Sequence, residues 1–367
     1  ARLDMEWIRR FMPQKKTDYA SSVYSPHEAG MAGYESAQKA AEFAGEAIGL
    51  DIAGTDIRDY FAPLLPWEIC AVQGQTSNGK TYFSDWWVRK IAKQLSDKES
   101  KKIIIKVSLE ESIEAMAFDE YSRILKVRSA DIARGEFTDW ARMQLAMSEI
   151  DNTQVWRIAD SSARSDSSPE LYLSNIYRCI ELLLSGEITG DKYELGVMVL
   201  DYLQALPIDP EIKSASRENQ RRLQVAQDVF RLRNMTVRLK APIIVNLQAK
   251  QKLEGANPPL LIPGTYDGME TSAIATRFDR IMSLWMPKTT HVVGQTIALP
   301  TGDYSVTDNG VMLKVNKQRG GLPSGKIFDL KIDYDNREYL RRFGKTVYER
   351  QLERDEAYER TRQQYDN

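Results

Sequence analysis

Residues 69–92 read ICAVQGQTSNGKTYFSDWWVRKIA, and this stretch decides the fold. An apolar run from Ile69 to Val72 leads into the pattern G-x-x-x-x-G-K-[ST], after which apolar residues recur at helical spacing. A strand, a glycine-containing loop and a helix in this order surround phosphate groups with backbone N–H groups and the positive end of the helix. The flanks favour this loop over an ordinary glycine turn. The predicted phosphate-binding residues are Gly74, Gln75, Thr76, Ser77, Asn78, Gly79, Lys80 and Thr81.

Two of these residues have predicted roles of their own. Lys80 supplies a mobile cation for the phosphates, and the Thr81 hydroxyl is a ligand for Mg²⁺. The sequence therefore predicts that a nucleoside triphosphate binds together with Mg²⁺ in an α/β domain.

The composition is that of an ordinary soluble protein, with 42% apolar and 28% charged residues and a formal net charge of −2 over 367 residues. No run approaches the roughly 18 apolar residues of a membrane helix, and the first residues lack the apolar core of a secretory signal. We therefore expect a cytoplasmic protein without a membrane partner. With two cysteines and two histidines, chemistry is expected to rest on carboxylates, lysine, arginine and a metal ion.

Short β-branched runs alternate with helix-length amphipathic stretches, which is typical of a mainly parallel sheet flanked by helices. Helices are expected from Ser168-Pro169-Glu170 onward, over 217–240 and over 27–48. The expected organisation is a helical N-terminal extension over 1–48, a nucleotide-binding domain over 49–334 and a charged C-terminal helix over 335–367. The strands are expected to start near Glu68, Lys102, Thr153, Gly196, Pro242, Asp279, Val311 and Lys326.

Two carboxylates follow predicted strands and complete the expected site. Asp201 ends the apolar run 196–201 and is predicted to organise Mg²⁺, with a simple strand-end cap as the alternative. Glu110 follows the run 103–109 and is predicted to activate a water molecule. The adjacent Glu111 is expected to be a first-turn acid of the next helix.

Several short motifs carry a family resemblance. Asp-Tyr-Leu-Gln at 201–204, Ser-Leu-Glu at 108–110 and Lys-Gln-Arg-Gly at 317–320, with matches at 49–52, 135–140 and 160–162, resemble the ATPase domain of DnaB-type replicative helicases, which are RecA-like. The resemblance covers about 49–334. The resemblance implies a RecA-like fold that binds ATP and Mg²⁺. The family has a separate N-terminal domain that binds primase, and in this sequence we expect only the short N-terminal helix in its place.

The resemblance also implies roles for individual residues. Lys80, Thr81, Glu110 and Asp201 keep the roles given above. Gln248, in Asn246-Leu247-Gln248 at the end of another apolar strand, senses the γ-phosphate. Lys317 and Arg319 reach into the site of a neighbouring subunit, with Arg319 as the arginine finger. This last assignment requires an oligomer, a hexameric ring in the family. Lys250 and Lys252 are candidate contacts to nucleic acid, with solvated loop lysines as the equal alternative.

These residues lead to a functional hypothesis with two competitors. The leading one is an ATP-hydrolysing ring motor of DNA replication that translocates on single-stranded DNA or unwinds it, with a loader or replisome protein as a further partner and 5′ to 3′ polarity implied only by resemblance. The alternative is a non-unwinding RecA- or KaiC-like ATPase acting as a loader, recombination mediator or regulatory switch, since KaiC-like relatives also carry adjacent glutamates as at Glu110-Glu111. A small-molecule kinase is the third class.

Overall fold

The computed structural model describes residues 25–42, 50–61, 63–97, 99–159, 170–208, 216–250, 262–268, 273–299, 302–319 and 323–342. The chain separates into two units, Ala1–Glu46 and Ala47–Asn367. In the first unit, α2 spans Pro26–Glu42, so the predicted N-terminal helix is confirmed over that range. The Ser25 hydroxyl accepts from the Glu28 N–H (3.2 Å) and the Glu28 carboxylate accepts from the Ser25 N–H (2.7 Å), a reciprocal cap that starts this helix.

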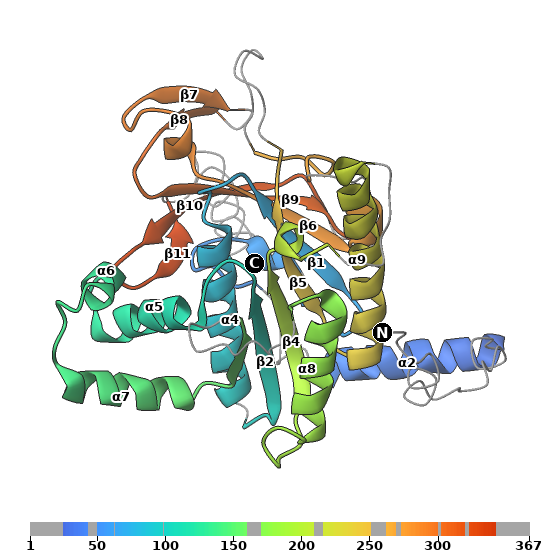
Figure 1. The fold of residues 1–367 in the computed structure, drawn as a ribbon. Helices are drawn as coiled ribbons and strands as arrows, with labels where there is room; N and C mark the ends of the chain where they lie inside the picture. Colours follow the sequence, from blue (N-terminus) through green and yellow to red (C-terminus); the bar gives the residue numbers. More distant parts are fainter. Residues whose placement is uncertain are drawn as a thin grey trace, which may run out of the picture. The chain divides into compact units, whose positions relative to one another are not determined.

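The described part of the second unit is built on a nine-stranded sheet in the order β11-β10-β9-β6-β1-β5-β4-β2-β3 (Figure 1). The strands from β6 to β3 are parallel, whereas β9, β10 and β11 continue the sheet in antiparallel fashion. The predicted mainly parallel sheet is confirmed. Its strands are β1 Ile69–Gly74, β2 Lys102–Ser108, β3 Val155–Ile158, β4 Glu194–Asp201, β5 Ile243–Gln248, β6 Arg280–Trp285, β9 Gly310–Lys317, β10 Ile327–Asp333 and β11 Glu338–Arg341.

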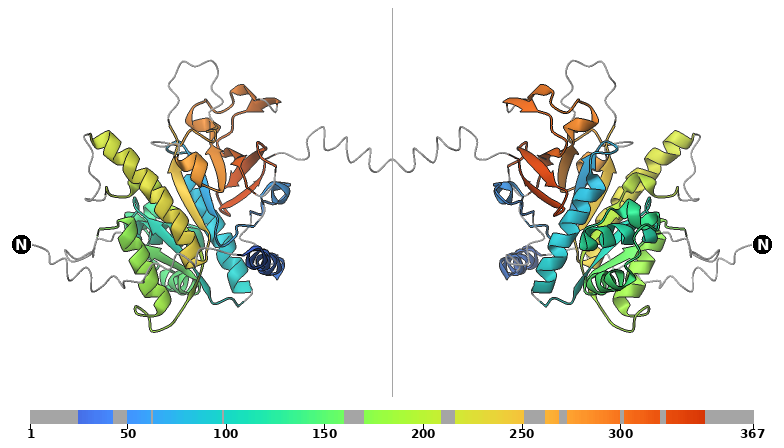
Figure 2. Two further views of the ribbon diagram at one scale, coloured as in Figure 1. Left: turned by 90° about the vertical axis from the view of Figure 1, so that its right-hand side faces the viewer. Right: turned by 90° about the vertical axis from the view of Figure 1, so that its left-hand side faces the viewer.

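Helices cover both faces of this sheet (Figure 2). Alternate residues of β1 explain the layers: Cys70 and Val72 join the apolar cluster around α4 (Lys80–Asp97), while Ile69 and Ala71 join the cluster that includes α8 (Leu173–Ser185) and α9 (Arg217–Leu239). Because β1 is covered on both sides, all of its residues are buried. The remaining described helices are α3 Ile57–Tyr60, α5 Ile113–Leu125, α6 Ser129–Ala133, α7 Trp140–Asp151 and α10 Ala273–Arg277, with 3₁₀ turns η3 Leu203–Ala205 and η4 Pro287–Thr289.

Strand register brings the ends of the parallel strands to one edge. Gly74 of β1 lies opposite Gln248 of β5, and Ser108 of β2 lies opposite Asp201 of β4. In open α/β sheets, ligands bind in the crevice outside the carboxyl ends of the strands. The candidate site is therefore expected at this edge, which we call the C-terminal edge.

One predicted helix start is wrong. The helix expected from Ser168-Pro169-Glu170 begins at Leu173, because Tyr172 has an extended backbone (φ −63°, ψ 153°). The Glu170 carbonyl accepts instead from the side chain of Asn175 at 2.7 Å. Ser168 and Pro169 lie outside the described residues.

The predicted C-terminal helix is also wrong at its beginning, because residues 338–341 form strand β11 against β10. Tyr339 is buried and packs edge-on against Trp86, with ring centroids 5.2 Å apart. The neighbouring Glu338 accepts from Trp86 Nε1 at 2.8 Å and pairs with Lys90 at 2.8 Å. These contacts to α4 favour a strand over the charge-rich helix that local sequence suggested. Residues 343–367 lie outside the described part.

A small hairpin between β6 and β9 was not predicted from the sequence. Strand β7 (Thr296–Leu299) pairs with β8 (Gly302–Ser305) in antiparallel fashion, apart from the main sheet. The described helices include none with the length and apolar character to cross a membrane.

Candidate nucleotide-binding site

The loop between β1 and α4 has the backbone that a phosphate cradle needs. Gly79 has φ +74°, and a Cβ there would lie 3.2 Å from the Met286 sulfur, so glycine suits this position on both counts. Asn78 ties the loop to the end of β6, because its side-chain oxygen accepts from the Met286 N–H at 2.7 Å. Its amide nitrogen donates to the Thr76 carbonyl at 3.1 Å. The polar sequence of this loop is therefore what holds it in shape.

Lys80 is the first residue of α4, directly after this loop, and its side chain is buried. Its ammonium donates to the Gln75 carbonyl at 3.0 Å and to Gln248 Oε1 at 3.3 Å, and Gln248 Nε2 donates to the Thr76 hydroxyl at 2.5 Å. Burial lowers the pKa of Lys80, while the negative charges of Asp201 and Glu110 oppose that shift. The structure thus brings Gln248 into contact with the phosphate loop, and its role toward the γ-phosphate stays a prediction.

A cavity of about 800 Å³ opens over the loop at the C-terminal edge. Lys80, Thr81, Asp201, Glu110 and Gln248 all line it, so residues predicted from separate strands meet in one place. Asp201 is buried at the end of β4, whereas Glu110 is exposed beyond β2. Carboxylates and a hydroxyl facing one cavity are suitable ligands for Mg²⁺.

Tyr202 adds a neighbour to Glu110 that sequence reasoning missed. Burial raises the pKa of Tyr202, and the charge of the hydrogen-bonded Glu110 carboxylate raises it further. Tyr202 and Glu110 therefore lie close to each other, and both line the cavity. The sequence did contain a signal for this residue, because Tyr202 directly follows Asp201, a predicted site residue.

Glu111 does not have its predicted position. Helix α5 begins at Ile113 with Ser112 as its cap, so Glu111 precedes the cap and the first-turn acid is Glu114. The Glu111 carboxylate lies 4.0 Å from the ammonium of Lys106, which is itself paired with Asp85 at 2.6 Å. Burial raises the pKa of Glu111, an effect that Lys106 opposes. Glu111 and Asp85 line the cavity beside Glu110, and both lie within ion-pair distance of the buried Lys106.

Aromatic and apolar side chains line another part of the cavity, among them Tyr82, Tyr334, Met286 and Ile332. The rings of Tyr82 and Tyr334 lie 6.4 Å apart in an edge-on arrangement. The ammonium of Lys288 donates to the Tyr334 hydroxyl at 3.3 Å and fixes that ring. Sequence reasoning missed this wall, because Tyr334 follows β10 and reaches the cavity only through the antiparallel extension of the sheet.

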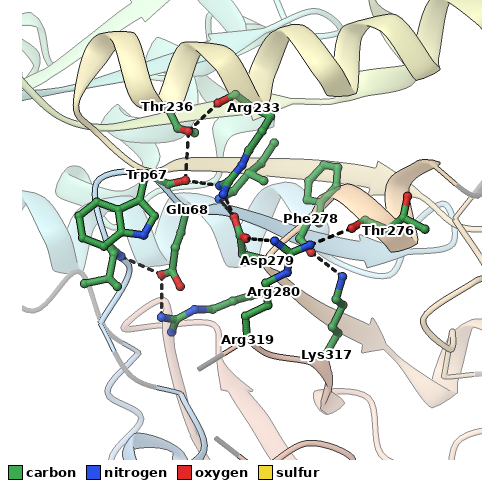
Figure 3. Close-up of polar contacts among 12 residues, drawn as sticks. Trp67, Glu68, Arg233, Thr236, Thr276, Phe278, Asp279, Arg280, Lys317 and Arg319 are labelled. Atoms are coloured by element: carbon green, nitrogen blue, oxygen red, sulfur yellow. Dashed lines mark hydrogen bonds and ion pairs between the residues drawn. The ribbon is translucent and has the colours of Figure 1, made fainter. Parts of the chain in front are cut away.

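Lys317 and Arg319 lie near the opposite edge of the sheet, where the parallel strands begin (Figure 3). Lys317 donates to the carbonyls of Ala275 (2.7 Å) and Phe278 (2.8 Å). Burial lowers the pKa of Lys317, and the charge of Arg319 lowers it further. The Arg319 guanidinium pairs with Asp279 at 3.1 Å. The structure therefore does not bring these two cations to the phosphate loop of their own chain.

Of the two lysines considered for nucleic acid, Lys250 is exposed just beyond β5. Its carbonyl accepts from the Gln75 side chain at 3.3 Å, which links this segment to the phosphate loop. Lys252 lies outside the described residues. A nucleic-acid role for both remains a prediction.

Comparison with known families agrees with this geometry. Residues 49–337 match the family model described as DnaB-like helicase C terminal domain. This chain belongs to that family. The match ends in the turn before β11.

One curated protein is similar in sequence to this DnaB-like domain. The replicative DNA helicase DnaB of Buchnera aphidicola subsp. Baizongia pistaciae (strain Bp) is 24% identical over 275 residues, covering 71% of this chain and 54% of that protein. The chain thus spans about half the length of this curated relative.

Solved structures share the fold. One of them, the ATPase domain of another protein, superposes with a TM-score of 0.63 at 20% identity, over 87% of this chain and 99% of that one. A DnaB-like replicative helicase, solved in a study of its interactions with primase, has a TM-score of 0.62 at 19% identity, over 86% and 68%. The predicted RecA-like fold class of the DnaB-like domain is confirmed.

The residues of the DnaB-like site fit Mg²⁺ bound together with a triphosphate. Within the described ranges, no group of three or more histidine, cysteine, aspartate or glutamate side chains could hold a metal ion alone. Mg²⁺ commonly takes one or two protein oxygens and completes its shell with phosphate oxygens and water. The hydroxyl of Thr81 and the carboxylate of Asp201, on one cavity with the phosphate loop, match that requirement.

Proposed function

We propose that this DnaB-like domain binds and hydrolyses ATP with Mg²⁺ and, as a homo-oligomeric ring, moves on single-stranded DNA. The observation that carries the proposal is the single cavity that joins the phosphate loop, Asp201, Glu110 and Gln248. Phosphoryl transfer depends mainly on positioning and on charge stabilisation, and these residues supply both.

The residues divide the work of hydrolysis. Lys80 and the loop N–H groups bind the phosphates, while Thr81 and Asp201 hold Mg²⁺. When bound, Mg²⁺ neutralises the charge that develops on the phosphate oxygens. Glu110 orients the attacking water and takes up its proton, and the aromatic wall at Tyr334 suits the flat face of a nucleobase. Gln248 contacts both Lys80 and Thr76, so it is the side chain best placed to respond to the γ-phosphate.

Completion of the site by a neighbour is supported by the distance between the two edges. Arg319 lies beside Asp279, whose backbone N–H donates to the Ile69 carbonyl at the start of β1, and the loop follows Gly74 at its end. At roughly 3.3 Å per residue, those strand positions are about 17 Å apart. Arg319 therefore cannot serve the loop of its own chain, and it becomes an arginine finger only in an adjoining copy.

The decisive experiment is ATP-dependent separation of a forked DNA duplex by the purified protein, with hydrolysis measured with and without single-stranded DNA. We expect DNA to stimulate hydrolysis, and DNA affinity to fall steeply as salt rises. Lys80→Ala protein is the control for ATP dependence. Absence of both unwinding and DNA stimulation would remove the motor and leave an ATPase that acts on a protein partner.

A further inference from the structure

Asp279 is a buried carboxylate placed between two arginines at the edge of the sheet opposite the cavity (Figure 3). Its Oδ2 atom accepts from Arg233 at 2.5 Å and from the Ile69 N–H at 3.0 Å. Its Oδ1 atom pairs with Arg319 at 3.1 Å. The two oxygens thus have separate tasks, because one anchors the sheet to α9 and the other faces Arg319.

This division of contacts stabilises the buried charge without using Arg319. A buried carboxylate needs a partner charge and hydrogen bonds, and Arg233 with Ile69 supplies both. Only 4% of the Asp279 side chain is exposed, whereas 51% of the Arg319 side chain is exposed. Asp279 is therefore a buried residue whose position is fixed by the sheet and by α9, and Arg319 is the surface side chain that pairs with it.

Arg319 is held at three points. Its backbone N–H donates to the Asp279 carbonyl at 3.1 Å, its Nη1 atom pairs with the Asp279 carboxylate, and its Nη2 atom donates to the Thr276 carbonyl at 3.0 Å. A guanidinium carries five N–H donors, so these contacts leave donors for another acceptor. An arginine held this way loses less rotamer entropy when it meets a phosphate than a free one would.

We propose that Asp279 is a positioning residue for Arg319, presenting its guanidinium at the subunit surface for the triphosphate bound by an adjoining copy. The inference rests on the proposed function, because it assigns the action of Arg319 to a neighbouring site. Asp279 itself touches no substrate. Through Arg319, Asp279 of one subunit influences the hydrolysis of ATP that is bound by the adjoining subunit.

Mixed-subunit hydrolysis tests this inference. In Asp279→Asn protein we expect normal binding of a fluorescent ATP analogue and turnover lowered roughly 10- to 100-fold, by analogy with the loss of a residue that orients a metal ligand. Mixing with Lys80→Ala subunits should restore turnover, because those subunits supply an intact Arg319. Mixing with Arg319→Ala subunits should not.

A double variant separates positioning from general destabilisation. If Asp279 acts through Arg319, Asp279→Asn lowers turnover no further in Arg319→Ala protein. Arg233→Ala is the matched control, because it removes the other arginine from Asp279. It should lower the melting temperature while its subunits still rescue Asp279→Asn subunits. Asp279→Glu, which keeps the charge, should recover part of the turnover and serves if the asparagine variant does not fold.

The outcomes that overturn the inference are distinct from failure of the proposed function. Faster turnover in Asp279→Asn protein would mean that the ion pair with Asp279 inhibits the action of Arg319. Unchanged turnover would mean that Asp279 does not influence the action of Arg319. If Arg233→Ala subunits, like Arg319→Ala subunits, fail to restore the turnover of Asp279→Asn subunits, Asp279 has only a structural role. If Arg319→Ala itself turns over normally, the shared site fails and the positioning role fails with it.

Discussion

The two edges of the central sheet carry opposite kinds of chemistry. At the C-terminal edge, Lys80 is buried among Gln75 and Gln248, and acidic side chains share its cavity. At the opposite edge, Lys317 and Arg319 lie on backbone carbonyls and on Asp279, and half of the Arg319 side chain is exposed. The first edge has what binding a triphosphate requires. The second has a half-exposed cation that lies away from the phosphate loop of its own chain. Under the proposed function, a protein divided in this way binds ATP as a single chain and completes its chemistry only in an assembly.

The largest effect is expected from the first edge alone. Lys80→Ala should abolish binding of a fluorescent ATP analogue, because the cation that faces the phosphates is lost from a buried position. Arg319→Ala should leave binding intact while turnover falls by orders of magnitude. Lys93→Ala is the matched control, since Lys93 is an exposed lysine of the same helix α4. Equal binding losses for Lys80→Ala and Arg319→Ala would break the comparison between the edges.

Within the first edge, the two adjacent glutamates should differ in their effect on turnover. Glu110→Gln should preserve ATP binding and lower kcat by about 10² to 10⁴, as expected for loss of a general base. Glu111→Gln should have a smaller effect, because its carboxylate faces Lys106. Single-turnover hydrolysis measures both. If only Glu111→Gln is inactive, the roles of the two residues are reversed.

The aromatic part of the cavity, formed by Tyr82 and Tyr334, allows a test of whether the first edge binds the nucleobase as well as the phosphates. Tyr334→Ala should weaken ATP binding by about 1 kcal/mol, roughly fivefold, because base–aromatic stacking is lost. Tyr334→Phe keeps the ring and loses only the hydroxyl contact to Lys288, so it should bind nearly as wild type. Titration of both variants with ATP and with inorganic triphosphate is the measurement. A loss of affinity that is the same for both ligands would mean that Tyr334 does not contact the base.

The smallest effect concerns Lys250, which lies beyond the first edge. Lys250→Ala should weaken single-stranded DNA binding evenly across sequences and reduce the salt dependence by about one unit of slope. Fluorescence anisotropy at several salt concentrations measures this slope. An unchanged slope with weaker ATP binding would place Lys250 in the nucleotide site, to which its backbone is linked through Gln75.

Much of the fold was predictable because the signals are local. The strand, loop and helix around Lys80 lie within one stretch of chain, and every predicted strand is found, as β1 to β6, β9 and β10. The C-terminal edge could be predicted too, because parallel strands end together and Asp201, Glu110 and Gln248 each lie at the end of such a strand or just beyond it. The helix predicted over 335–367 is wrong at its beginning because its signal was only local. Charge density concealed Tyr339, whose burial depends on distant residues of α4.

By itself, the sequence determined the phosphate loop, the parallel core and the acidic residues of the site, since short-range pattern and strand periodicity suffice for these. Only the tertiary structure decided that Tyr334 reaches the cavity, that Glu111 faces Lys106, and that Asp279 lies between Arg233 and Arg319. Such contacts join residues far apart along the chain, as in the bond from the Ile69 N–H to Asp279 across 210 positions. They depend on strand register and on which side chains compete for one buried charge, and neither is encoded in any local pattern.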